Sequence, residues 1–163
     1  MTIRVLVADD QAMIRGALAG LLDLERDIEV VAQAADGVQA LEELARLATK
    51  DTQSAQPPTN SARPDSPADV AIIDIEMPHM DGITTTEAIR ARFPGVRVLI
   101  VTTFGRPGYL QRALDAGATG FMVKNAPVEA LAEGVRTLAA GGRAIDRSLA
   151  VEALSAGSSS LTQ

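Results

Sequence analysis

The sequence predicts an α/β fold in which helices cover both faces of a five-stranded parallel sheet. Five short apolar runs alternate with helical patterns along the chain. The runs are rich in Val and Ile and do not alternate between polar and apolar residues, which is typical of strands buried on both faces. Glycines and prolines mark the joints between these units, among them Gly82, Pro94, Gly117, Pro127 and Gly141.

The first two strand–helix units are expected within the first 48 residues. The run IRVLVA precedes one stretch of helical periodicity, and EVVAQA precedes a second one. A strand followed directly by a helix is the unit from which parallel sheets are built. The predicted strands are 3–8 and 29–34, and the predicted helices are 11–25 and 37–48.

A polar segment of low complexity then breaks the rhythm. It reads TKDTQSAQPPTNSARPDSP and contains four prolines, where a connection of about 2–6 residues is usual. We expect a disordered insertion at about 49–68. Because it joins a helix to a strand, it should project from the sheet edge opposite the carboxyl ends of the strands. It is either a tolerated surface insertion, which we favour, or a partner-binding segment.

Three further units follow the insertion. The apolar runs VAIID, RVLIVT and GFMV each precede a helical pattern. The predicted strands are 70–74, 97–102 and 120–123, and the predicted helices are 82–92, 107–116 and 127–140. The chain continues with a short helical pattern from 146 and then a Ser-rich stretch that reaches Gln163.

Composition excludes several classes of function. A chain of 163 residues with 47% hydrophobic residues is long enough for one ordinary core. A net charge of -6 disfavours a nucleic-acid surface within the chain. The absence of cysteine excludes disulfides and thiolate zinc sites, and the single His disfavours a His-based metal site. No apolar run approaches the roughly 18 residues of a membrane span, so we expect a cytoplasmic protein with no membrane partner.

Three carboxylates follow predicted strands. Asp9 and Asp10 follow the first strand, and Asp74 ends the third. Sites in open parallel sheets form at the carboxyl ends of strands, where the strand order reverses. If the first and third strands are neighbours, these acids converge, and two charges 4 Å apart repel by about 4 kcal/mol. Such a cluster must take up protons or bind a cation, and its oxygen ligands favour Mg²⁺.

Two residues on later strands complete a phosphoryl-binding set. Lys124 follows the fifth strand and Thr102 ends the fourth, so both belong to the same sheet edge. An ionised Asp74 needs no general base to attack phosphorus, and Lys124 would neutralise charge on the transferred group. Each residue alone has a simpler interpretation: the Asp pair as helix cap and first-turn acid, Lys124 as a solvated side chain, and Thr102 as an ordinary strand residue.

Taken together, VADD, DIEMPHMDG, VTT and GFMVK resemble the receiver domain of bacterial two-component response regulators. The resemblance covers roughly residues 2–140 apart from the insertion, and it is greatest to the NarL/LuxR subfamily with its DesR-type members. It implies a flavodoxin-like fold with strand order 2-1-3-4-5. It also implies a receiver domain at 1–142, with a linker helix and the start of a truncated helix-turn-helix DNA-binding domain at 143–163.

The resemblance also assigns roles to individual residues. Asp74 would be the phosphoacceptor, and a sensor histidine kinase would be its donor. Asp9, Asp10, Asp74 and the backbone carbonyl of Glu76 would hold Mg²⁺, for which Mn²⁺ or Ca²⁺ could substitute. Thr102 and Lys124 would contact the phosphoryl group. Such a domain is not an enzyme in the usual sense, because it catalyses only its own phosphorylation and slow dephosphorylation.

The aromatic switch position of the family is Phe121, where a Tyr hydroxyl is absent. Asn125 stands where Asp is common. His79, the single His, is expected in a loop without partner residues, where it is exposed to solvent or packs within the loop. Phosphorylation would change the dimerisation of the domain and thereby control transcription. Only the missing DNA-binding domain would contact DNA.

The first helix has more apolar residues than a core-facing stripe needs. An apolar arc covers roughly half its circumference and consists of Met13, Ile14, Ala17, Leu18, Leu21, Leu22 and Leu24. This indicates a homodimer contact on the first helix, beside or instead of the face formed by the fourth helix, fifth strand and fifth helix. A more deeply buried first helix is the alternative.

Two other functions stay open at this point. Phosphatases and phosphotransferases of the haloacid-dehalogenase type also use an Asp nucleophile and Mg²⁺ at a strand end. They need a second Asp two residues later, where this chain has Glu76, and the chain has no cap domain. A pseudo-receiver that only mediates protein contacts is disfavoured by the intact set of Asp9, Asp10, Asp74 and Lys124.

Overall fold

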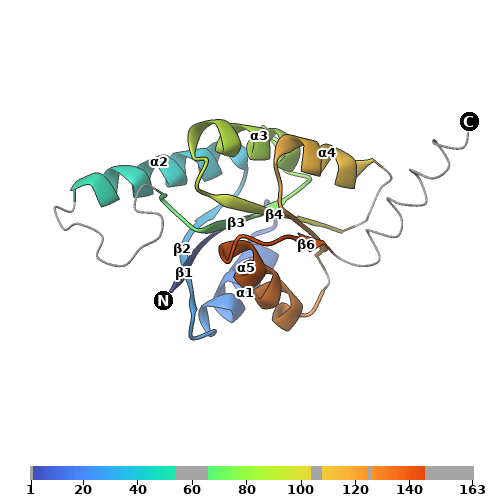
Figure 1. Ribbon diagram of the computed structural model, residues 1–163, viewed down its shortest axis with the longest axis horizontal. Helices are drawn as coiled ribbons and strands as arrows, with labels where there is room; N and C mark the ends of the chain where they lie inside the picture. The colour runs from blue at the N-terminus through green and yellow to red at the C-terminus, as the bar shows by residue number, and fades with distance from the viewer. Residues whose placement is uncertain (1, 54–65, 104–107, 125, 146–163) are drawn as a thin grey trace, which may run out of the picture.

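In the computed structural model, the described residues are 2–53, 66–103, 108–124 and 126–145. They form five helices and one parallel sheet of six strands in the order β2-β1-β3-β4-β5-β6 (Figure 1). The strands are β1 (Ile3–Ala8), β2 (Ile28–Ala34), β3 (Val70–Asp74), β4 (Arg97–Thr102), β5 (Gly120–Val123) and β6 (Ala144–Ile145). The helices are α1 (Ala12–Asp23), α2 (Gly37–Gln53), α3 (Gly82–Arg92), α4 (Tyr109–Ala116) and α5 (Val128–Ala139).

The predicted order of the first five strands is confirmed, but the prediction of five strands was one too few. β6 pairs in parallel with β5 at the edge of the sheet, so the sheet extends past the predicted receiver boundary at 142. A strand of two residues shows no readable hydrophobic period, and this is why the sequence did not reveal it. The linker helix and the domain start that were predicted within 143–163 lie outside the described residues from 146 on.

The insertion is shorter than predicted. Helix α2 continues to Gln53, because extending a helix that has already formed adds a hydrogen bond for each residue fixed. At the other end Ser66 is buried and its hydroxyl donates to the carbonyl of Ala68. Asp69 is tied to the first strand, since it accepts from Arg4 N at 2.9 Å and its own N–H donates back at 2.8 Å. Residues 54–65, the rest of the predicted disordered segment, lie outside the described residues.

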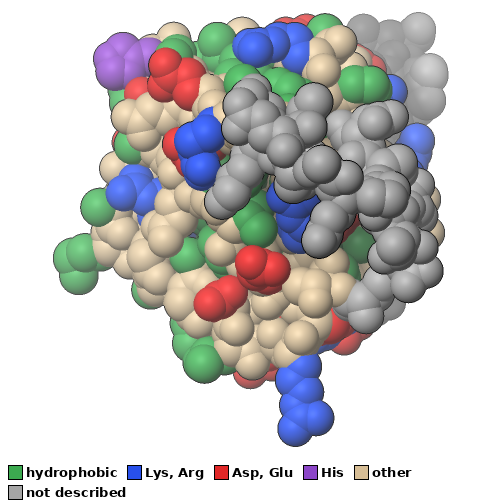
Figure 2. Space-filling view, turned by 90° about the vertical axis from the view of Figure 1, so that its left-hand side faces the viewer, with side chains coloured by type: hydrophobic (Ala, Val, Ile, Leu, Met, Phe, Trp, Pro, Cys, Tyr) green, Lys and Arg blue, Asp and Glu red, His purple; other side chains and the backbone are tan. Residues whose placement is uncertain are grey.

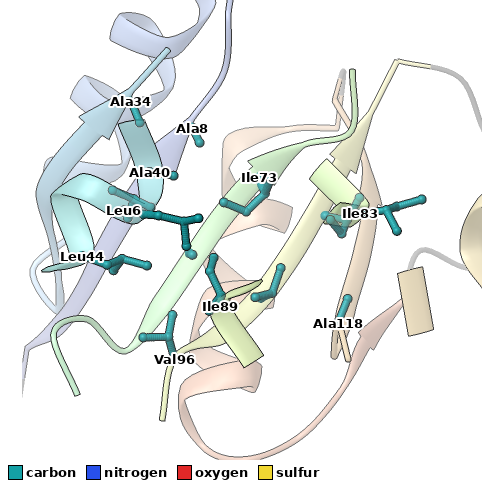
Figure 3. Packing of buried hydrophobic residues seen from close by; sticks show 14 of the residues in the cluster. Leu6, Ala8, Ala34, Ala40, Leu44, Ile73, Ile83, Ile89, Val96 and Ala118 are labelled. Carbon is teal, nitrogen blue, oxygen red and sulfur yellow. The ribbon is translucent and has the colours of Figure 1, made fainter. Parts of the chain in front are cut away.

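The helices form a layer on each face of the sheet. α2, α3 and α4 cover one face, and α1 and α5 cover the other (Figure 1). All five residues of β3 are buried, as expected for a central strand that helices cover on both sides. A hydrophobic core lies between the sheet and each helix layer. Figure 3 shows the core under α2, α3 and α4, which contains Leu6, Ile73, Ile89 and Leu44 of α2. The carboxyl ends of β1, β3, β4 and β5 are therefore held in place by a well-packed core.

Candidate functional site

The three predicted carboxylates do converge at one edge of the sheet. β1 and β3 are neighbours, so the residues that follow them meet, and one oxygen from each of Asp9, Asp10 and Asp74 lies within 4.8 Å of the others. Asp9 and Asp74 are buried, whereas Asp10 is exposed. An acidic cluster that is half buried and half open to solvent could hold a cation that keeps some of its water ligands.

Asp9 and Asp10 do not cap helix α1, so the simpler interpretation of this pair is wrong. The N-cap of α1 is Gln11, and the first turn of the helix has no acidic residue. Asp9 instead accepts from the Gln11 N–H at 2.9 Å through Oδ1, and the Arg15 guanidinium donates to the Asp9 carbonyl at 2.8 Å. The Gln11 bond orients the Asp9 carboxylate and the Arg15 bond holds its backbone, and the other carboxylate oxygen, Oδ2, belongs to the contact with Lys124.

Lys124 lies within this cluster and is not a solvated surface side chain. Its Nζ is 2.8 Å from Oδ2 of Asp9 and 3.2 Å from Oδ2 of Asp74, and only 10% of its side chain is exposed. Its backbone N–H donates to the carbonyl of Thr102 at 2.7 Å, which fixes the end of β5 to the end of β4. Nζ also contacts Oε1 of Gln11 at 3.3 Å.

Burial raises the pKa of Asp74 to about 6, and the nearby charges of Asp9 and Asp10 act in the same direction against the attraction of Lys124. Burial disfavours the charge on Lys124, but its contact with Asp9 and the attraction of Asp74 outweigh this, so its pKa is raised. The site therefore holds more negative charge than its single ammonium can balance. A divalent cation would restore the balance.

A cavity of about 180 Å³ lies beside the cluster. Its walls are Asp10, Gln11, Asp74, Ile75, Glu76, Thr102, Thr103 and Lys124. The donors on these walls are carboxylate, carbonyl and hydroxyl oxygens, which are the ligands that Mg²⁺ prefers. Oδ2 of Asp9 is buried, and it faces Nζ of Lys124 at 2.8 Å, so a bound cation would share this oxygen with the lysine. The residues present fit an oxygen-bound divalent cation such as Mg²⁺.

Two of the predicted site residues do not line the cavity: Asp9 lies behind it, in contact with Lys124, and Phe121 is separate from it. Phe121 lies on β5, 1% exposed, within the core that α2, α3 and α4 cover. Thr102 is buried at the end of β4 and lines the cavity. Asn125 lies outside the described residues.

Sequence reasoning missed two features of the site. Gln11 contacts Lys124, and only its place directly after the Asp pair hinted at this. His79 was expected to have no partner, but its Nδ1 is 2.9 Å from Oδ2 of Asp36. The two residues are 43 positions apart, and no local pattern connects a loop residue to a helix cap at that distance. The expectation that His79 lacks a partner was therefore wrong, whereas its expected exposure to solvent is confirmed.

Comparison with known proteins agrees with this geometry. The family of response regulator receiver domains matches residues 5–136. The chain is 38% identical over 141 residues to the uncharacterized transcriptional regulatory protein YvfU of Bacillus subtilis, covering 86% of this chain and 61% of YvfU. It is also 38% identical over 141 residues to the transcriptional regulatory protein DesR of the same organism, covering 86% of this chain and 60% of DesR.

Solved structures give the same result. The receiver domain of the response regulator NarL from Mycobacterium tuberculosis matches with a TM-score of 0.70 and 30% identity, over 86% of this chain and 98% of that one. A LuxR-family response regulator from Aurantimonas matches with a TM-score of 0.76 and 26% identity, over 95% and 97%. The predicted resemblance is thus confirmed: the chain belongs to the response regulator receiver domain family and is similar to members of the NarL/LuxR type.

Proposed function

We propose that this domain accepts a phosphoryl group on Asp74 from the phosphohistidine of a sensor histidine kinase. The observation that carries the proposal is the contact of Lys124 with both Asp74 and Asp9 beside an open cavity. A site that served only packing would not leave a buried carboxylate at the wall of a solvent-connected hollow. The family match supports this assignment over a haloacid-dehalogenase phosphatase.

The side chains divide the work of the transfer. An oxygen of Asp74 attacks phosphorus, and the bond from phosphorus to the donor nitrogen breaks, so the electron pair leaves with the imidazole. Lys124 stabilises negative charge on the transferred group, and the Thr102 hydroxyl binds one of its oxygens. Asp9, Asp10, Asp74 and the Glu76 carbonyl would hold Mg²⁺, which when bound neutralises charge on the phosphoryl oxygens. Hydrolysis of the aspartyl phosphate would return the domain to its first state.

Phosphorylation would act as a conformational switch. Thr102 would move towards the phosphoryl group, and Phe121, now buried, would fill the space that it leaves. The surface of α4, β5 and α5 would then repack. Such a switch works by shifting the populations of two states that differ in packing.

The output would be transcription control through a DNA-binding domain. The chain spans about 60% of the length of the curated relatives it matches, and these are transcriptional regulatory proteins. The net charge is -6, and Figure 2 shows acidic and basic side chains interspersed among the described residues of one face. Neither feature suits binding of this domain itself to nucleic acid.

No described helix has both the length and the apolar character needed to cross a membrane.

The domain would form a homodimer through helix α1. Four large apolar side chains of its surface are exposed: Met13 by 89%, Leu24 by 77%, Leu21 by 46% and Ile14 by 41%. A symmetric contact places the same patch on both partners, so a patch without charge avoids the repulsion that acidic copies would otherwise meet. Leu18 and Leu22 belong to the core and not to this patch.

The test of the phosphoacceptor uses the protein, Mg²⁺ and acetyl phosphate, followed by intact mass measurement. One added phosphoryl group in the wild type and none in Asp74→Ala would support the proposal. An unmodified wild type would favour a pseudo-receiver, and continuous release of phosphate from phosphate esters would favour a phosphatase.

A further inference from the structure

The loop between β3 and α3 contains a tight turn with an unusual backbone. The N–H of Met80 donates to the carbonyl of Pro78 at 2.7 Å, which closes a three-residue turn around His79. His79 has a φ of 69° and is the one non-glycine residue with positive φ among the described residues. A turn of this kind is rare and strained, and such a backbone persists only where its surroundings hold it.

A contact from another element holds this turn. Nδ1 of His79 lies 2.9 Å from Oδ2 of Asp36, although 71% of the His79 side chain is exposed (Figure 2, purple). Asp36 precedes α2 and is itself fixed, since its Oδ1 accepts from the N–H of Gln39 at 2.8 Å. The Gln39 N–H and then His79 hold the pKa of Asp36 below its usual value. Asp36 is thus a fixed, ionised anchor for the turn.

The start of α2 presses directly on the same loop. A Cβ placed on Gly37 would lie 2.0 Å from Oγ1 of Thr85 and 2.9 Å from both Cβ and the carbonyl oxygen of Met80. The base of the loop is closed separately, because the Gly82 N–H donates to the carbonyl of Ile75 at 2.9 Å. The segment 76–80 is therefore clamped at its base by the Gly82 bond and at its tip by α2.

We propose that Asp36 and His79 are positioning residues that fix the 76–80 loop so that the Glu76 carbonyl faces the metal site. The inference rests on the proposed function, because it takes the Glu76 carbonyl as a ligand. Glu76 lines the same cavity as Asp10 and Asp74. A change of side-chain rotamer cannot alter the direction of a backbone carbonyl. Its direction depends wholly on the backbone, and the strained turn begins two residues after it.

Loss of the Asp36–His79 contact should weaken metal binding without removing a ligand. Partners that orient metal ligands typically contribute roughly 10- to 100-fold in affinity, and a single backbone ligand belongs at the lower end of that range. We expect the dissociation constant for Mn²⁺ to rise about tenfold. The rate of phosphorylation by acetyl phosphate at saturating metal should stay close to that of the wild type, since Asp74, Lys124 and Thr102 are untouched.

Two variants break the contact from opposite sides. His79→Gly removes the imidazole but keeps the positive φ, which Gly adopts readily. Asp36→Ser keeps a side chain that caps α2 but is too short to reach His79, and it leaves the loop sequence unchanged. His79→Asn keeps a residue that tolerates positive φ and can donate a hydrogen bond, so it should recover part of the affinity. Thr84→Ala, an exposed position in the first turn of α3, is the matched control.

Binding of Mn²⁺ is measured by isothermal titration calorimetry on the protein without a phosphodonor, and thermal unfolding verifies that each variant is folded. Weaker Mn²⁺ binding in both single variants, a double variant no weaker than either, and unchanged binding in Thr84→Ala would support the inference. Unchanged affinity in His79→Gly and Asp36→Ser, with a wild type that binds Mn²⁺, would overturn it and leave the proposed function intact. A wild type that binds no Mn²⁺ would overturn both.

Discussion

The ammonium nitrogen of Lys124 lies 3.2 Å from Oδ2 of Asp74, although the two residues are 50 positions apart in the chain. The same nitrogen is 2.8 Å from Oδ2 of Asp9. β4 separates β3 from β5 in the sheet, so the lysine reaches across the end of β4 to meet the two carboxylates. In the metal-free protein, the ammonium group of Lys124 offsets the repulsion between the buried carboxylates of Asp9 and Asp74.

Replacement of Lys124 by Met should therefore destabilise the metal-free protein. Removing one partner of a buried ion pair leaves an uncompensated charge, which costs about 3–5 kcal/mol, and partial hydration of the site places our expectation at about 3 kcal/mol. Urea unfolding at pH 7.5 in the presence of a chelator measures the loss.

The size of this loss should depend on pH. At pH 5, Asp74 can take up a proton, because burial raises its pKa to about 6 in the wild type and the loss of Lys124 would raise it further. The variant should therefore be closer to the wild type at pH 5 than at pH 7.5. A deficit that is equal at both pH values would mean that the packing of the Lys124 stem, and not its charge, accounts for the effect.

Much of this site could be predicted from the sequence because its parts are strand ends. Asp9, Asp74, Thr102 and Lys124 each follow or end an apolar run, and parallel strands put such positions on one edge. The strand order that joins them came from the resemblance, since periodicity does not determine which strands are neighbours. In the folded sheet these separate residues come together at one site.

Asp74→Asn should stabilise the metal-free protein near neutral pH. The pKa of Asp74 is raised from 3.8 to about 6 on folding, so the folded state binds more protons than the unfolded state between these values. Stability is then lost as pH rises through this window, and the full cost of the ionised carboxylate is present above pH 6. The shift corresponds to at most about 3 kcal/mol, and we expect a gain of about 1–2 kcal/mol at pH 7.5.

Two comparisons test this explanation for Asp74→Asn. The gain should vanish towards pH 4, where the wild-type carboxyl is protonated in the folded state. Adding Mg²⁺ should raise the Tm of the wild type and change that of the variant much less, because a ligand that binds only the folded state stabilises it. Thermal unfolding with and without Mg²⁺ provides both results. Equal stabilisation of the two proteins by Mg²⁺ would contradict the assignment of Asp74 as a ligand.

The features that the sequence did not reveal depend on contacts between distant segments or on short elements. The pair of Asp36 and His79 joins two loops that are unremarkable when each is read alone. β6 is two residues long, too short for any period. The sequence showed that α1 has more apolar residues than a core-facing stripe needs. Which of its leucines are exposed depends on how the helix is rotated on the sheet. Leu18 and Leu22 face the core, whereas Leu21 and Leu24 face outward.

Gly82→Ala should damage the site through the backbone. A Cβ at Gly82 would lie 2.5 Å from the carbonyl oxygen of Asp74 and 2.8 Å from the Cα of Ile75, which are atoms that cannot move aside as a side chain does. We expect a loss of about 2–3 kcal/mol in stability and a lower rate of phosphorylation by acetyl phosphate. Gly16→Ala is the control, because a Cβ there meets nothing within 4 Å and should stabilise α1 by roughly 0.5–1 kcal/mol. A Gly82→Ala variant as stable and active as the wild type would show that the end of β3 can shift freely.

The exposed apolar patch of α1 predicts the effect of charge on dimerisation. Leu21→Glu and Leu24→Glu place a charge on the outward side of the helix, where the side chains are 46% and 77% exposed. Each variant should keep the stability of the monomer within about 0.5 kcal/mol and shift the dimer equilibrium towards monomer, because a symmetric contact would bring two like charges together. Leu22→Glu is the opposite control, since a charge at a fully buried position should unfold the domain. Light scattering on the protein with and without a phosphoryl analogue measures the outcome. If both outward variants dimerise as the wild type does, the face of α4, β5 and α5 becomes the dimer surface to test.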